Sequence, residues 1–206
     1  MTYPEEVKTI RSPHTLREDR VPLGQRVTDK LPVLQFRDVP EIDISEWSLR
    51  ITGLVKEEVE LSYQEFMSLP RIKVITDVHC VTGWTKLDIQ WEGVSTATVK
   101  DLASPLPEAR YVMIHSADGY TTNLLLSDFL QPDALFAVKL NGESLSVEHG
   151  FPVRLVVPGL YFWKSAKWVV GVEFMRENRP GYWEARGYHM RGDPWKEERY
   201  SHEYHE

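Results

Sequence analysis

Apolar and polar side chains alternate with a period of two in the middle of the chain. The stretch 47–53, Trp-Ser-Leu-Arg-Ile-Thr-Gly, is typical of a half-buried strand, because successive strand side chains point to opposite faces. Further strands are predicted at 59–61, 71–78, 111–115, 120–126, 134–140, 153–157 and 168–175. The pattern therefore predicts a fold dominated by short strands.

Turn and capping residues separate these segments. The dipeptides Asp-Gly at 118–119 and Asn-Gly at 141–142 predict tight turns between strands. Ser62 and Glu65 have the spacing of a capping box and predict a short helix. Two more short helices are predicted, one over 95–102 and one capped by Ser127. Together these elements predict an α+β domain in which helices are inserted between strands of a mixed sheet.

The two ends of the chain differ from the middle. Residues 1–40 are polar and interrupted by prolines, which predicts an extended N-terminal arm packed on the domain rather than regular elements. Residues 176–206 are charged but rich in tryptophan and tyrosine, so this tail is expected to pack on the body. We therefore expect a single domain over 41–206, with the arm 1–40 attached to it.

Composition narrows the function. The 206 residues include one cysteine, which excludes an internal disulfide and a zinc cluster made of cysteines alone. A net charge of −7 argues against a dedicated nucleic-acid partner, because counterion release needs clustered lysine and arginine. No apolar run approaches the roughly 18 residues of a membrane span, and the start has no secretory pattern. A cytoplasmic location is expected.

The single cysteine is the first candidate for chemistry. Cys80 follows His79 at the end of a predicted strand and precedes a turn, where proteins usually present reactive groups. The plainer interpretation is that Cys80 is a small buried apolar residue. A nucleophilic Cys80 activated by a nearby histidine is a further alternative.

Basic residues gather in two later loops. The loop 148–154, Glu-His-Gly-Phe-Pro-Val-Arg, brings His149 and Arg154 to the start of an apolar strand. The segment 164–168 brings Lys164 and Lys167 to the start of another. Arginine and lysine suit phosphate or carboxylate, so these loops suggest a polyanion bound beside a thiolate. The alternative is ordinary surface loops whose cations pair with some of the 31 acidic residues.

Three motifs stand in the order found in sulfite oxidase-type molybdopterin enzymes. They are His-Cys-Val at 79–81, the HGFPVR loop with its strand over 148–158, and Ser-Ala-Lys-Trp at 165–168. Over roughly residues 41–174 the chain resembles this family, and its tail is similar to that of a bacterial, single-domain subgroup. The resemblance implies the mixed-sheet fold of the molybdopterin-binding domain and a molybdenum–molybdopterin cofactor.

The resemblance also implies roles for individual residues. Cys80 would be the metal-binding thiolate, and the segment 30–32 would close over the cofactor. The implied cofactor-binding residues are His79, Cys80, Ser116, His149, Arg154, Ser165, Ala166 and Lys167. Tyr188 and Arg186 would lie in the substrate pocket and complete the catalytic set with Cys80. His79 would either contact the pterin or support the cysteine from behind.

The implied function is an oxidoreductase that transfers an oxygen atom to or from a small oxyanion or sulfoxide-type substrate. One-electron exchange with a heme or flavin partner is implied, because one cysteine cannot hold an iron–sulfur cluster. The resemblance does not extend to the sulfite-binding arginine, since Thr-Asp-Lys occupies 28–30. No dimerisation domain follows, so a monomer is expected. A non-catalytic pterin-binding module remains an alternative.

Overall fold

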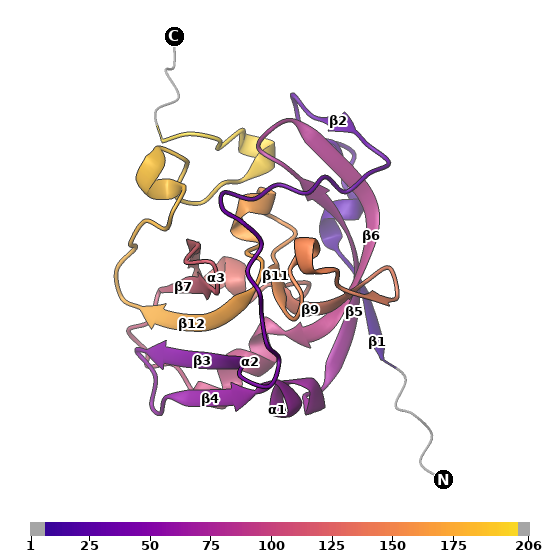
Figure 1. The fold of residues 1–206 in the computed structure, drawn as a ribbon. Helices are drawn as coiled ribbons and strands as arrows, with labels where there is room; N and C mark the ends of the chain where they lie inside the picture. The colour runs from indigo at the N-terminus through magenta and orange to yellow at the C-terminus, as the bar shows by residue number, and fades with distance from the viewer. Residues whose placement is uncertain (1–6, 202–206) are drawn as a thin grey trace.

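Two β-sheets form the body of the protein in the computed structural model, which describes residues 7–201 (Figure 1). The parts of the predicted arm and domain that fall on 1–6 and 202–206 lie outside the described residues. The larger sheet has the order β1-β5-β6-β9-β10, with β11 also paired to β9 and β2 to β6. The smaller sheet has the order β4-β3-β12-β7-β8. Parallel and antiparallel pairs occur in both sheets, as the predicted α+β class requires.

The strands include every segment that the sequence predicts as a strand, together with others that it does not predict. In the larger sheet they are β1 (Lys8–Arg11), β2 (Arg26–Val27), β5 (Arg71–His79), β6 (Trp84–Ser95), β9 (Leu135–Leu140), β10 (Glu143–Ser144) and β11 (Arg154–Val156). In the smaller sheet they are β3 (Ser48–Gly53), β4 (Val59–Ser62), β7 (Tyr111–Ser116), β8 (Thr121–Leu125) and β12 (Val169–Met175). The predicted hairpin at 118–119 is confirmed, because β7 and β8 pair antiparallel on either side of it.

The helices are short and connect strands. They are α1 (Tyr63–Ser68), α2 (Thr96–Ala103) and α3 (Leu126–Phe129), with 3₁₀ turns η1 (Pro13–Leu16), η2 (Val147–His149), η3 (Phe162–Lys164), η4 (Glu184–Arg186) and η5 (Pro194–Lys196). The capping box of α1 is confirmed, since Ser62 and Glu65 exchange side-chain and backbone hydrogen bonds. The predicted cap of α3 is wrong: Leu125 occupies the N-cap position, and Ser127 lies inside the helix.

The N-terminal arm was expected to lack regular elements, and this is wrong for two short stretches. β1 pairs in parallel with the edge of β5, and β2 pairs in parallel with the start of β6. The unpaired backbone groups of these neighbouring strands supply the hydrogen bonds that the polar arm sequence does not predict. The arm thus begins as part of the larger sheet.

Strand β6 was also absent from the predicted elements. Its first part is irregular, because Asp88 has a left-handed φ of 53° and the pairing with β5 shifts register between Thr76 and Val78. Its second part, residues 91–94, is buried on both faces, since Val94 packs in the main core and Trp91 packs in a second apolar cluster with Val74. A bulge followed by two-sided burial removes the alternation that identifies a strand in sequence.

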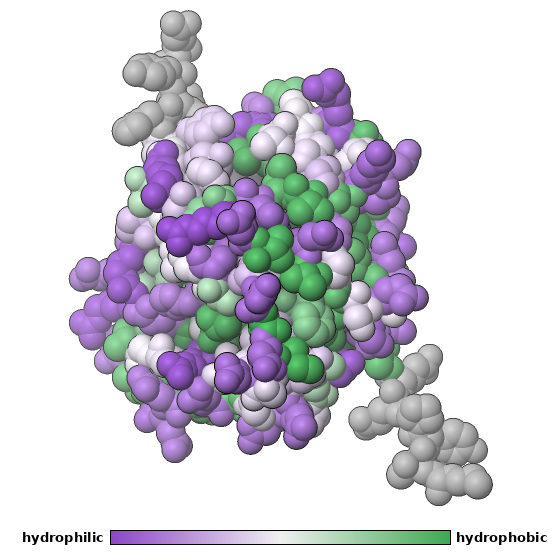
Figure 2. Space-filling view, in the orientation of Figure 1, coloured by the Kyte–Doolittle hydropathy of each residue, from purple (hydrophilic) through white to green (hydrophobic). Residues whose placement is uncertain are grey.

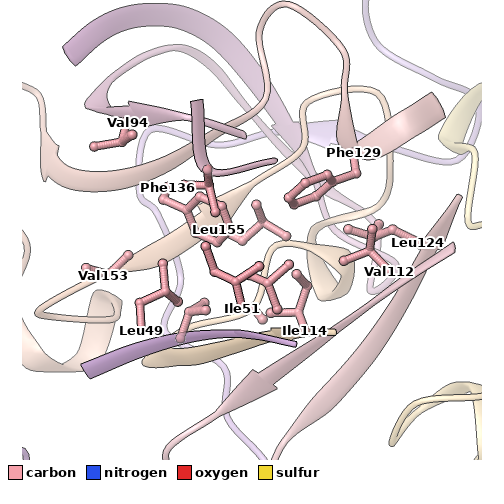
Figure 3. Packing of buried hydrophobic residues seen from close by; sticks show 14 of the residues in the cluster. Leu49, Ile51, Val94, Val112, Ile114, Leu124, Phe129, Phe136, Val153 and Leu155 are labelled. Atoms are coloured by element: carbon pink, nitrogen blue, oxygen red, sulfur yellow. The ribbon is translucent and has the colours of Figure 1, made fainter. Parts of the chain in front are cut away.

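The main core lies between the two sheets. Leu49 and Ile51 of β3 and Ile114 of β7 face Phe136 of β9 and Leu155 of β11, as Figure 3 shows. All five side chains are fully buried. Burial of each such side chain contributes about 1.5–3 kcal/mol, so this layer holds the two sheets in a fixed relation. A second cluster around Trp91 and Val74 packs on the larger sheet.

The C-terminal tail packs on the body, as its aromatic content predicts. Tyr182 donates its backbone N–H to Thr121 of β8, and a Cβ at Gly181 would lie 2.5 Å from the Thr121 carbonyl oxygen. This close approach requires glycine at position 181. Among residues 7–201, no helix is long and apolar enough to cross a membrane.

Candidate functional site

A cavity of about 340 Å³ opens beside the turn that carries Cys80. Its walls come from segments far apart in sequence: the arm at 32–36, the turn at 80–84, the loops 148–154 and 162–168, and the tail residues Trp183 and Tyr188. The arm passes across the front of the molecule after β2 (Figure 1). Apolar surface is visible in the middle of this face in Figure 2, and Val33 and Leu34 of the arm are exposed.

Cys80 lies at the end of β5, in a turn closed by a hydrogen bond from the Gly83 N–H to the Cys80 carbonyl at 3.0 Å. Gly83 has a left-handed φ of 93°, which explains the glycine at this position. The thiol is 6% exposed, packs with Tyr161, and lies 3.2 Å from the Thr82 hydroxyl. Burial raises the pKa of the Cys80 thiol. A metal ion bound at the sulfur would reverse this and hold the thiolate.

Arg154 is the most unusual charged group of the cavity. Its guanidinium is 2% exposed and lies over the ring of Phe162 at 4.3 Å. It donates to two backbone carbonyls, those of His149 at 3.0 Å and Ser165 at 2.9 Å, while its Nε has no hydrogen-bond partner in the described part of the chain. Burial lowers the pKa of Arg154 to about 9. Within residues 7–201, no carboxylate forms an ion pair with this guanidinium. A buried cation of this kind suits an anionic ligand.

Lys167 brings a further positive charge to the same end of the cavity, and the imidazole of His149 lies in the same wall. Lys167 donates to the Glu148 carbonyl at 2.9 Å, and burial together with the charge of Arg154 lowers its pKa to about 8. Burial and then Arg154 lower the pKa of His149 too. The loop brings them together because Gly150 has a φ of 110°, and a Cβ there would lie 2.9 Å from the Arg154 Cβ. Mutually repelling cations in one wall indicate an anion-binding subsite.

Ser165 and Ala166 line the same wall but use their backbone. The Ser165 carbonyl accepts from Arg154, and its hydroxyl accepts the backbone N–H of Val157 at 3.0 Å. The Ala166 carbonyl accepts from the Leu155 N–H at 2.8 Å. These bonds fix the wall against β11, so the cavity-facing groups are held by the sheet.

Lys164 does not belong to the cavity, contrary to the expectation that it joins Arg154 and Lys167. Its ammonium is fully buried on the other side of η3, 2.6 Å from Glu184. It also donates to the Asn123 and Met190 carbonyls at 2.8 and 2.7 Å. Lys164 therefore ties the tail to the body, while Lys167 lines the cavity.

Three other predicted site residues do not line the cavity. His79 is buried behind the turn, with Nδ1 2.9 Å from the Thr85 hydroxyl and its ring against Trp195, and burial lowers its pKa to about 4. Ser116 is buried, and its backbone N–H donates to the carbonyl of Tyr120, a residue that lines the cavity. Arg186 is exposed, and its guanidinium lies 3.6 Å from the centroid of the Tyr182 ring.

An aromatic wall beside Cys80 was largely missed from the sequence. Tyr188 lines the cavity, stacks on Trp183 at 5.0 Å and meets Trp163 edge-on at 5.2 Å. Burial raises the pKa of Tyr188, so its phenol stays protonated at neutral pH. The density of aromatic residues in the tail was the available signal, but the pairing with Trp163 of η3 depends on the fold.

Metal-binding capacity can be judged from the donor set. Nowhere in residues 7–201 do three or more histidine, cysteine, aspartate or glutamate side chains converge as a metal cluster. A metal at Cys80 would therefore take its remaining ligands from a bound group. The thiol, the unpaired Arg154 Nε and the adjacent Lys167 fit a ligand with a soft metal at one end and a phosphate at the other.

Comparisons with known proteins agree with this donor set. Residues 36–183 match the family described as oxidoreductase molybdopterin binding domain. The chain is 49% identical over 183 residues to the uncharacterized oxidoreductase YuiH of Bacillus subtilis, covering 88% of this chain and 92% of that protein. It is 31% identical over 155 residues to the protein-methionine-sulfoxide reductase catalytic subunit MsrP of Gluconobacter oxydans, covering 66% and 49% of the two chains.

The chain is also similar to part of two longer proteins. It is 29% identical over 188 residues to sulfite oxidase of Arabidopsis thaliana, covering 74% of this chain and 48% of that one. The crystal structure of the sulfane dehydrogenase SoxCD from Paracoccus pantotrophus superimposes with a TM-score of 0.62 at 22% identity, covering 68% and 40%. This likeness supports the fold. The chain thus spans nearly all of YuiH but about half of MsrP and of the sulfite oxidase.

Proposed function

Because the chain belongs to the oxidoreductase molybdopterin binding domain family, we propose that it transfers an oxygen atom to or from a small substrate at a molybdenum held by Cys80. Its substrate would be a small oxyanion or a sulfoxide. Family membership makes the protein a molybdopterin-dependent oxidoreductase. The assignment of individual residues is the part that needs testing.

The buried guanidinium of Arg154 is the observation that carries the residue assignment. An arginine that is 2% exposed, with its pKa lowered to about 9 and one Nε–H unpaired in the described chain, is poorly stabilised by the protein alone. A phosphate would accept that N–H and offset the cost of burying the charge. Arg154, Lys167 and His149 would thus hold the phosphate end of molybdopterin, with Ser165 and Ala166 shaping the wall.

Cys80 would hold the metal end. The thiol opens onto the cavity from the end of β5, and its turn is fixed by the hydrogen bonds of Gly83 and Trp84. When bound, the molybdenum–molybdopterin group supplies two-electron redox chemistry coupled to oxygen-atom transfer. The chain contributes a sulfur held in a fixed turn and a cavity lined by basic and aromatic residues. His79, neutral at physiological pH because its pKa is about 4, would support the turn from behind.

The aromatic wall would form the substrate side. Tyr188 keeps its proton at neutral pH, because burial raises its pKa, so its O–H can donate a hydrogen bond to a substrate oxygen. Trp163 contacts the Tyr188 ring edge-on, and Trp183 stacks on its face, so the two indoles fix the orientation of the phenol. Ser116 would approach the pterin from the side of Tyr120, and a role for Arg186 would require the tail to move.

The reading of Cys80 as a nucleophile has less support. The neighbouring His79 directs Nδ1 to Thr85 and packs its ring on Trp195, so it does not act on the sulfur. Burial raises the pKa of the free thiol, which lowers the fraction of reactive thiolate. A mechanism based on a cysteine nucleophile would also not explain why the Arg154 guanidinium is buried without a carboxylate partner in the described chain.

The proposal extends to the electron partner, the location and the oligomeric state of the enzyme. A heme or flavin protein would exchange single electrons with the site, and the protein would act as a cytoplasmic monomer with 41–206 as one domain. Stopped-flow reduction by candidate partners, cell fractionation and sedimentation of the purified protein test these points. Membrane-associated activity or a stable dimer would overturn the corresponding part.

The central experiment measures molybdenum and pterin in protein purified from a host that makes molybdopterin. We expect about one molybdenum and one pterin per chain, since the family holds one such group in one site. Arg154→Ala should lose most of its pterin, Arg154→Lys should retain part, and the exposed control Arg176→Ala should stay loaded. A wild-type protein without molybdenum would overturn the proposed function, and full loading of Arg154→Ala would remove Arg154 from the phosphate site.

A further inference from the structure

The turn of Cys80 is held by segments from both ends of the chain. From the N-terminal side, the Gln25 amide donates to the Cys80 carbonyl at 3.1 Å, and the backbone N–H of Arg26 donates to the Gly83 carbonyl at 2.9 Å. From the C-terminal side, the Arg199 guanidinium donates Nη1–H to the Val81 carbonyl. Three carbonyls of one four-residue turn are therefore held by residues from remote parts of the sequence.

Arg199 approaches the thiol in a second way. Its guanidinium lies 5.1 Å from the centroid of the Tyr161 ring, and Tyr161 is a fully buried residue that packs with Cys80. The charge of Arg199 also acts on Cys80 in the direction that lowers the thiol pKa, against the larger effect of burial. Arg199 therefore reaches the Cys80 turn through the Val81 carbonyl and through the Tyr161 ring. It is not among the residues that line the cavity.

The position of Arg199 is fixed by contacts with the N-terminal segment around Gly24 and with its own C-terminal tail. A Cβ at Gly24 would lie 3.2 Å from Arg199 Nη2, so the N-terminal segment approaches the guanidinium closely at a glycine. The Arg199 carbonyl accepts the backbone N–H of His189 at 3.1 Å, and Tyr188 forms a β-bridge with Tyr200. Both end segments lie outside residues 36–183, the region matched to the family.

We propose that Arg199 is a positioning residue for Cys80, which fixes the 80–83 turn through Val81 and places a positive charge near that turn. This inference rests on the proposed function. The planar guanidinium fork of arginine holds one orientation better than the ammonium of lysine. A cation near a metal-bound thiolate stabilises the electron-richer form of the site, so Arg199 raises the reduction potential of the metal.

The test is a redox titration of the purified holoenzyme at fixed pH, followed by the electron paramagnetic resonance signal of Mo(V). Arg199→Gln removes the charge but keeps an amide donor near Val81, and Arg199→Lys restores the charge. The matched control is Lys196→Gln, which removes one charge from an exposed residue of the same tail. Thermal unfolding of each variant reports any loss of stability separately.

We expect Arg199→Gln to shift the midpoint potential to lower values, Arg199→Lys to recover most of the shift, and Lys196→Gln to match wild type. Equal potentials in Arg199→Gln and wild type, or equal shifts in Arg199→Gln and Lys196→Gln, would overturn the inference. If Arg199→Gln binds too little metal to titrate, full loading of Arg199→Lys supports the role of the charge, and loss of metal there refutes it. Absence of molybdenum from wild type would instead overturn the proposed function.

Discussion

The buried pair of Lys164 and Glu184 should be a major support of the fold. The two side chains are fully buried and 2.6 Å apart. The Lys164 ammonium also binds the Asn123 carbonyl and side chain and the Met190 carbonyl, so its replacement breaks contacts to both β8 and the tail. Lys164→Met would fill most of the volume but leave the Glu184 charge without its counterion.

The expected cost follows from this uncompensated charge. Removing one partner of a buried ion pair typically costs about 3–5 kcal/mol. With a urea dependence of about 2 kcal/mol per molar, the unfolding midpoint should fall by about 2 M. Glu184 also accepts from the Trp163 indole at 2.8 Å, so disturbance at Glu184 reaches the cavity wall.

Urea unfolding followed by tryptophan fluorescence and far-ultraviolet circular dichroism measures the effect. Adding Glu184→Gln to Lys164→Met should recover part of the loss, because a neutral amide still accepts from Trp163. The control is Lys100→Met, which breaks an exposed pair with Asp101 and should cost less than about 1 kcal/mol. A Lys164→Met protein within about 1 kcal/mol of wild type would refute this reasoning.

Three further predictions concern the cavity and its support. Cys80→Ala should abolish molybdenum binding and turnover while circular dichroism shows a folded protein; bound metal in this variant would remove Cys80 from the metal site. Gly150→Ala should destabilise the fold by about 1–3 kcal/mol and reduce pterin content, because it strains a φ of 110° and places a Cβ 2.9 Å from the Arg154 Cβ. Stability should fall as the pH drops from about 6.5 to about 4, since the His79 pKa is lowered to about 4 by burial and the unfolded chain binds that proton first. His79 contributes up to about 3 kcal/mol of this loss, and unfolding curves of His79→Gln that keep the full pH dependence would contradict the assignment.

Local sequence was sufficient where a signal depends on neighbouring residues. The alternation at 47–53, the turn at 118–119 and the capping box of Ser62 and Glu65 all appear in the structure at the expected places. Strand β6 could not be recognised, because its irregularity near Asp88 depends on pairing with β5 and its two-sided burial depends on two apolar clusters built from distant segments. The arm strands β1 and β2 exist for the same reason, since they complete the hydrogen bonding of neighbours remote in sequence.

The candidate site shows the same division. The residue types and their order identified Cys80, His149, Arg154 and Lys167, and the fold brings these four to one cavity. Sequence placed Lys164 with them, because two lysines three residues apart in one loop cannot be distinguished until their contacts in the fold are known. Tertiary structure alone turns Lys164 to Glu184, aligns Trp163 with Tyr188, and brings Arg199 to the turn of Cys80.

The sequence by itself determined the class of chemistry: a single thiol, a loop ending in arginine, and the residue order of a molybdopterin enzyme. Those features are chemical identities and short spacings, which survive without knowledge of the fold. Tertiary structure decided which cations face the cavity, which wall is aromatic, and how both ends of the chain hold the cysteine turn. Burial, pKa and charge partners arise from contacts between distant segments, so they become defined when the two sheets and the tail have packed together.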